Sequence, residues 1–273
     1  MIINNIFQTY YDSVIPTNIK NKIEILKKIN NNFNYFFFTN DDCLNFIKNN
    51  YNKYLEIYLN YPHFLQRENI FKLLIVYHYG GFFFDTNFLA NKNIEDLQKY
   101  SCVFPEEKEI SNKIFYKKYG RSPYNLNELK QIGIYAFGAE KGHPLLLNII
   151  DEISNRYYDF KSTPINLLGT NILIIEKTTG SDIISIIYHS YSTFYDNIKI
   201  LKGDDLIGKN PNKCCPPNWY KFGIYGEFFY SDNLQEIKDF SDSESFKINI
   251  NKSDSDSDSD SDLEIYNHKC IIT

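Results

Sequence analysis

An aspartate and an asparagine two positions apart, Asp85 and Asn87, directly follow the apolar run Phe82–Phe84. In open α/β sheets, ligands bind outside the carboxyl ends of the strands. Residues two apart in an extended segment project to the same side, so we expect the two side-chain oxygens to converge. Such oxygens bind hard divalent cations, and a cation held there could clamp a diphosphate. A strand that simply runs into a turn would carry the same residue types.

The segment before this pair predicts the element that positions it. Residues 63–79 read as a helix, which Gly80 and Gly81 stop. Asn69 and Lys72 lie three residues apart and therefore on one face of that helix. The sequence thus predicts a helix, a glycine turn, a buried strand and then a polar triplet.

The wider pattern alternates strands with helices and predicts an α/β fold with a mostly parallel sheet flanked by helices. Thr39 is predicted to cap the helix that follows the second strand. The predicted strands are 2–9, 34–38, 82–84, 132–138 and 197–201, and the predicted helices are 15–29, 40–47, 63–79, 144–158 and 181–191.

Composition narrows the class of protein. The 273 residues carry a net charge of -5, which argues against nucleic-acid binding. The five cysteines form no C-x-x-C pair, which favours reduced thiols and a cytoplasmic location. We expect no signal peptide and no transmembrane segment.

The acidity is concentrated at one end of the chain. Residues 239–264 hold nine acidic residues and two lysines, and the alternating Ser/Asp run within them cannot bury apolar surface. The rest of the chain is close to neutral. We therefore predict one domain over residues 1–238 and a disordered acidic tail over residues 239–273. A tail that recruits a basic partner is a further functional hypothesis.

The stretch Val76–Asp85 resembles glycosyltransferase family 32, the DXD sugar-binding-region group with the GT-A fold. The family pattern reads roughly A-x-D-x-x-R-Y-x-x-L-Y-x-Y-G-G-I-Y-x-D-x-D. Weaker similarities, in the family's order, are Ile6–Tyr10, Phe36–Ile47, Gly142–Pro144 and Thr178–Ser181. The Asn- and Lys-rich composition resembles giant-virus (mimivirus-like) homologues, which would place the protein in host cytoplasm or a virion.

The resemblance implies a single GT-A domain that transfers a sugar from a nucleotide sugar, a UDP-sugar or GDP-mannose, to a glycan, lipid or protein hydroxyl. Family members are generally retaining and metal-dependent. Asp85 would contact the sugar or ribose, and Asn87 would join it in holding Mn²⁺ or Mg²⁺. Asp85 and Asn87 are thus the expected catalytic and metal-binding pair. The expected donor-binding residues are Arg67, Asn69, Lys72, Gly80, Gly81 and Asp85.

Three polar positions depart from the family pattern. Asn69 and Asn87 stand where Asp is usual, and Lys72 stands where Arg is usual. Asn keeps one oxygen but loses the charge that tunes metal affinity. The family's C-terminal histidine is also missing, and Glu227 or Asp232 is a candidate replacement. These losses motivate a second hypothesis, a catalytically degenerate protein that binds sugar nucleotides or acts as a scaffold.

Overall fold

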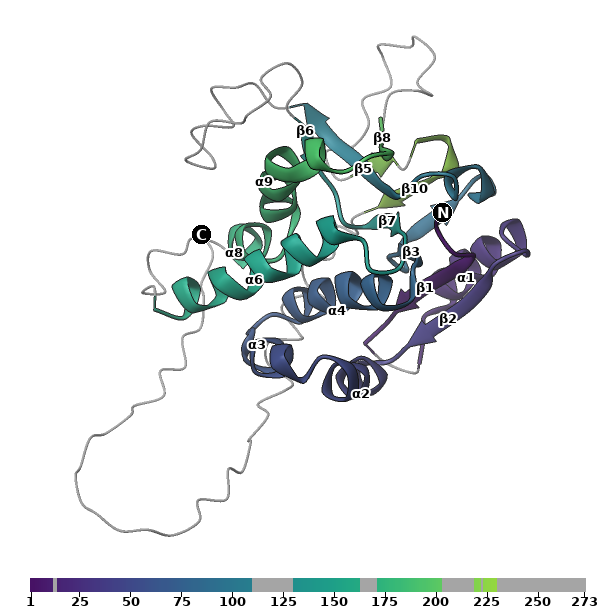
Figure 1. Ribbon diagram of the computed structural model, residues 1–273. Helices are drawn as coiled ribbons and strands as arrows, with labels where there is room; N and C mark the ends of the chain where they lie inside the picture. Colours follow the sequence, from purple (N-terminus) through teal and green to yellow (C-terminus); the bar gives the residue numbers. More distant parts are fainter. Residues whose placement is uncertain (12–13, 110–129, 163–170, 203–218, 222, 230–273) are drawn as a thin grey trace, which may run out of the picture. The chain divides into compact units, whose positions relative to one another are not determined.

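The structure is a computed structural model (Figure 1), and its described residues all belong to one compact unit, Met1–Asn233. The predicted acidic tail lies outside the described part of the chain, so the domain division stays a prediction. No helix in the described part is both long and apolar enough to span a membrane. The structure describes residues 1–11, 14–109, 130–162, 171–202, 219–221 and 223–229.

The N-terminal part is built as predicted, from two strand–helix units. Strand β1 (Asn5–Thr9) leads to α1 (Thr17–Ile29), and β2 (Asn34–Phe38) leads to α2 (Asn40–Asn50). The strands β1 and β2 pair in parallel. Thr39 caps α2 in a capping box, in which its hydroxyl accepts from the backbone N–H of Asp42. Polar capping therefore fixes where the second helix begins.

Helix α4 and strand β3 form the centre of the unit. Helix α4 (Phe64–Tyr79) is followed at once by β3 (Gly81–Phe84), which pairs in parallel with β1. All four residues of β3 are buried. Phe83 packs into the apolar cluster that includes α4, whereas Phe82 and Phe84 pack on the opposite face with Leu26 of α1. The alternating faces of β3 explain why its sequence is apolar throughout.

Gly81 provides a first test of this arrangement. Its φ is +131°, and an added Cβ would lie 2.6 Å from the backbone oxygen of Asn5. We expect Gly81→Ala to lower the free energy of unfolding by roughly 2 kcal/mol or more, measured by urea denaturation. Gly142→Ala is the matched control, because Gly142 also has a positive φ but has open space around its Cβ position. Equal losses in the two variants would contradict the close approach of β3 to β1.

The later strands of the sheet pair antiparallel, so the prediction of a mostly parallel sheet was wrong. The strand order is β2-β1-β3-β7-β5-β6, with β8 also pairing with β5. Three pairings are parallel and three, β3–β7, β7–β5 and β5–β6, are antiparallel. The strand predicted over 132–138 is in fact two, β6 (Lys130–Ile132) and β7 (Ala136–Ala139). Both β6 and β7 run antiparallel to β5, β6 alongside Glu106–Glu109 and β7 alongside Cys102 and Val103.

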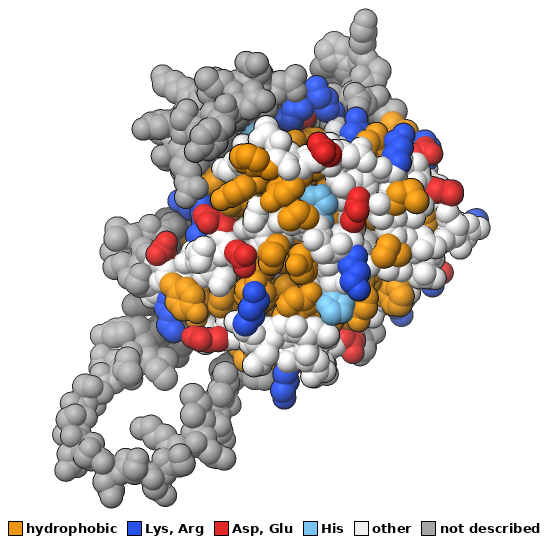
Figure 2. Space-filling view, in the orientation of Figure 1, with side chains coloured by type: hydrophobic (Ala, Val, Ile, Leu, Met, Phe, Trp, Pro, Cys, Tyr) orange, Lys and Arg blue, Asp and Glu red, His pale blue; other side chains and the backbone are white. Residues whose placement is uncertain are grey.

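Helices cover both faces of the sheet, which confirms the predicted α/β class (Figure 1). Helix α6 (Pro144–Ser162) packs beside α4 and α9 (Ser181–Tyr191). Figure 2 shows both signs of charge interspersed among apolar side chains on the face that α4 and α6 present. The remaining elements are η1 (Asn52–Tyr54), α3 (Leu55–Asn60), β4 (Phe88–Ala90), η2 (Glu95–Leu97), β5 (Cys102–Glu109), α8 (Asn171–Thr178), η3 (Ser192–Phe194), β8 (Ile198–Leu201), β9 (Trp219–Lys221), η4 (Gly223–Tyr225) and β10 (Gly226–Phe229).

Candidate functional site

Asp85 lies at the carboxyl end of β3, and its backbone is fixed by residues from three segments. Its N–H donates to the carbonyl of Tyr135 at 2.8 Å, which extends the β3–β7 pairing by one residue. Its own carbonyl accepts from the N–H of Phe88 at 2.9 Å and from the side-chain amide of Gln8 at 3.2 Å. The buried Gln8 in turn accepts from the hydroxyl of Tyr35 at 3.0 Å. These hydrogen bonds hold the backbone of Asp85 in place at the carboxyl end of β3, which lies between β1 and β7 in the sheet.

The Asp85 carboxylate belongs to a buried ionic cluster with two residues of α4. The Nζ of Lys72 lies 2.5 Å from Asp85 Oδ1 and 3.5 Å from Glu68 Oε1. The Lys72 side chain is 3% exposed, and Glu68 and Asp85 are 11% and 19% exposed. The same ammonium lies 5.4 Å from the ring centroid of Phe83, which adds a cation–π contact. This ionic cluster of Glu68, Lys72 and Asp85 joins the first half of α4 to the end of β3.

Burial shapes the electrostatics of the ionic cluster. Burial alone would lower the pKa of Lys72, but the two carboxylates raise it above its usual value, so Lys72 is charged. Burial raises the pKa of Asp85, and the positive charge of Lys72 partly offsets that rise. Burial likewise raises the pKa of Glu68 to about 7, against the lowering effect of Lys72. One ammonium thus serves two carboxylates, and burial raises the pKa of both.

The chain at Asp85 and Asn87 does not have the extended geometry that the sequence predicted. Residues 85–88 form a turn, closed by the hydrogen bond from Phe88 to Asp85, so the two side chains are not on one side of a strand. Instead, the Nζ of Lys22 on α1 lies 3.4 Å from Asn87 Oδ1 and 3.3 Å from its backbone carbonyl. The period-2 argument fails here because β3 ends at Phe84.

Asn69 lies on α4 next to Glu68 but contacts a different segment. Its side-chain amide donates to the hydroxyl of Thr179 at 3.3 Å, and Gln66 donates to the hydroxyl of Thr178 at 2.7 Å. All four side chains are buried. The structure therefore brings the Thr178–Ser181 segment, one of the weak sequence similarities, against the helix that carries Lys72.

The other predicted donor-binding residues lie apart from the ionic cluster. Gly80 and Gly81 are at the opposite end of β3 from Asp85, where a Cβ on Gly80 would lie 2.7 Å from the backbone nitrogen of Lys141. Arg67 is half-buried on α4, and together with burial its charge lowers the pKa of His63. The two glycines thus serve the backbone turn, and the structure does not bring them to the carboxylate.

Two residues near the site were not predicted from the sequence. Glu68 precedes Lys72 by four positions, and this spacing on a helix is itself a signal for an ion pair. Lys22 carried no such signal, because its partner Asn87 is 65 residues away. Of the proposed replacements for the missing histidine, Asp232 lies outside the described residues. Glu227 is on β10, whose backbone pairs it with Leu89 of β4.

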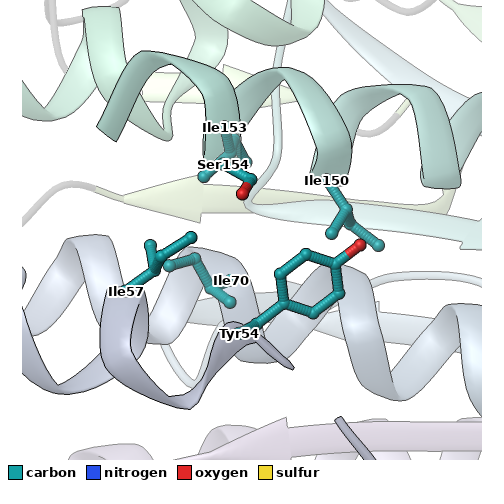
Figure 3. A pocket seen from close by; sticks show the side chains of 6 residues that line it. All are labelled: Tyr54, Ile57, Ile70, Ile150, Ile153 and Ser154. Carbon is teal, nitrogen blue, oxygen red and sulfur yellow. The ribbon is translucent and has the colours of Figure 1, made fainter. Parts of the chain in front are cut away.

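A small pocket between α3, α4 and α6 does not belong to this site (Figure 3). It is lined by Tyr54, Ile57, Ile70, Ile150, Ile153 and Ser154, and four of these are aliphatic. Ile70 is two positions from both Glu68 and Lys72, so it points about 200° around the helix from each. The pocket therefore lies on the other face of α4, and its lining offers no pair of titratable groups.

The predicted metal site does not fit its residues well. The Asp85 carboxylate is already paired with the ammonium of Lys72, which Glu68 also contacts, and the Asn87 oxygen faces the ammonium of Lys22. A divalent cation binds where negative oxygens converge, and here two positive groups already occupy them. No group of three or more His, Cys, Asp or Glu side chains in the described part of the chain could hold a metal ion.

Comparison with known proteins finds glycosyltransferases. Residues 16–104 match the family model described as a glycosyltransferase sugar-binding region containing a DXD motif. An uncharacterized glycosyltransferase, L373, of Acanthamoeba polyphaga mimivirus is 34% identical over 96 residues, which are 35% of this chain and 38% of that protein. The residues matched by the family model, 16–104, run from α1 through the Asp85–Phe88 turn to β5 and include the whole ionic cluster.

Longer but weaker similarities extend beyond that region. Inositol phosphoceramide mannosyltransferase 2 of Schizosaccharomyces pombe is 26% identical over 214 residues, 75% of this chain and 53% of that protein. The structure titled PaToxG Glycosyltransferase has a TM-score of 0.44 and 14% identity, covering 70% of each chain. This chain thus spans between about a third and just over half of its curated relatives. The match of residues 16–104 to a glycosyltransferase sugar-binding region containing a DXD motif agrees with the family 32-like resemblance seen in the sequence.

Proposed function

We propose that this chain is a glycosyltransferase that binds a nucleotide sugar at the carboxyl end of β3. The observation that carries the proposal is the position of Asp85, fixed through its backbone and its ion pair within the matched sugar-binding region. The carboxylate would accept a hydrogen bond from a hydroxyl of the sugar or ribose. The lysines nearby would stabilise the negative charge that grows on the departing nucleoside diphosphate.

The relatives' names support a proposal for the donor and the acceptor. Several curated relatives are named inositol phosphoceramide mannosyltransferases, which favours GDP-mannose as the donor and a glycolipid hydroxyl as the acceptor. UDP-sugars are the other donor class, and the family resemblance adds retention of the anomeric configuration. Because Asp85 and Asn87 contact lysines, the proposal includes no step through Mn²⁺ or Mg²⁺.

A donor screen tests this proposal. The protein is incubated with GDP-Man, UDP-Glc, UDP-Gal or UDP-GlcNAc, with and without inositol phosphoceramide, and release of GDP or UDP is measured. We expect release with one donor class, accelerated by the lipid acceptor. The binding or scaffold hypothesis instead predicts that calorimetry detects donor binding while no nucleotide is released. If no donor bound and no nucleotide were released, both hypotheses would be contradicted.

A further inference from the structure

The two side chains that would hold a metal ion in this fold each contact a lysine instead. Lys72 pairs with Asp85 at 2.5 Å, and Lys22 contacts Asn87 at 3.4 Å through the side chain and 3.3 Å through the backbone. The lysines come from different helices, α4 and α1, on opposite faces of the sheet. Two independent elements therefore deliver positive charge to the same turn at the end of β3.

The charge of the side chains at this turn also differs from the family pattern. Asn87 stands at this turn where the pattern has an aspartate, so one negative charge is absent there. A resident ammonium beside a neutral carboxamide thus reaches the same local charge as a metal ion beside a carboxylate.

We propose that Lys22 takes the place of the divalent cation, so that the donor's diphosphate binds this chain without a metal ion. In this arrangement Lys72 neutralises Asp85, and the ammonium of Lys22, oriented by Asn87, contacts the diphosphate oxygens. The inference rests on the proposed function, because it assumes a nucleoside diphosphate at this turn.

Calorimetry with UDP and GDP provides the test, and it needs no acceptor and no turnover. We expect the wild-type protein to bind the preferred nucleotide in EDTA as tightly as in Mn²⁺, within about threefold. Lys22→Gln should weaken binding in EDTA about tenfold, because a charged hydrogen bond to phosphate is lost. Lys28→Gln, an exposed site on the same helix, is the matched control and should bind as the wild type does.

A double variant should restore metal dependence. Lys22→Gln with Asn87→Asp removes the resident ammonium and completes the D-x-D pair, so its nucleotide binding should be strong only with Mn²⁺. Wild-type binding that is lost in EDTA and restored by Mn²⁺ would overturn the inference while supporting the proposed function. Wild-type affinity in Lys22→Gln would also overturn it. Absence of nucleotide binding with and without Mn²⁺ would instead contradict the proposed function itself.

Discussion

Asp85→Asn is expected to reduce donor turnover about 100-fold, the loss typical of removing one aligned electrostatic contact from an active site. The substitution keeps the size of the side chain but removes the charge that Lys72 pairs with at 2.5 Å. Because the backbone of Asp85 is held by Gln8, Tyr135 and Phe88, the side chain should stay near its place. Release of UDP or GDP from the preferred donor is the measurement.

An exposed aspartate serves as the control for this prediction. Asp96 also pairs with a lysine, Lys92 at 3.0 Å, but its side chain is 62% exposed. Asp96→Asn should leave donor turnover unchanged, because an exposed ion pair contributes little. If Asp85→Asn turned over donor as fast as Asp96→Asn does, the end of β3 would not be the reaction site.

The second large effect concerns stability. Lys72→Met removes the cation from the ionic cluster and leaves Glu68 and Asp85 buried without their partner, so we expect the free energy of unfolding to fall by about 3 kcal/mol. Lys72→Arg, which keeps the charge, should lose much less. Adding Glu68→Gln to Lys72→Met should recover part of the loss, because one buried carboxylate is then neutral.

The loss in Lys72→Met should depend on pH with a defined sign. Glu68 has a pKa raised to about 7 even with Lys72 present, and removing the ammonium raises it further. Its carboxyl then holds its proton in the folded state over a pH range in which the unfolded chain has lost it. Stability therefore falls as pH rises through that range, so the loss should be larger at pH 8 than at pH 5. Urea denaturation at the two pH values measures it, and an equal loss at both would contradict a cost from buried carboxylates.

The local elements of the fold were predictable because each has a local signal. Thr39 is the N-cap of α2, Gly80 follows the last residue of α4, and three consecutive phenylalanines form a strand buried on both faces. The direction of the strands was not predictable in the same way. The antiparallel pairings of β7 with β3 and β5 join segments far apart in the chain, and the sequence of β7 itself does not reveal them.

The sequence identified two residues of the ionic cluster but did not predict their contacts. Asp85 and Lys72 were both identified, and the structure joins them. The extended conformation expected at Asp85 and Asn87 was wrong, since residues 85–88 form a turn. The contacts of Asn87 with Lys22 and of Asn69 with Thr179 join residues 65 and 110 positions apart, which no spacing rule can reveal.

The position of β3 in the sheet also bears on the order in which this protein folds. Asp85 is held by Gln8, 77 residues earlier in the chain, and by Tyr135, which follows it by 50 positions. Both contacts require long loops to close, and the entropy of that closure is lost before the contacts form. We therefore expect the carboxylate to reach its final place late in folding. In a chain still being synthesised, the proposed donor site would not be complete until β7 has emerged and joined the sheet.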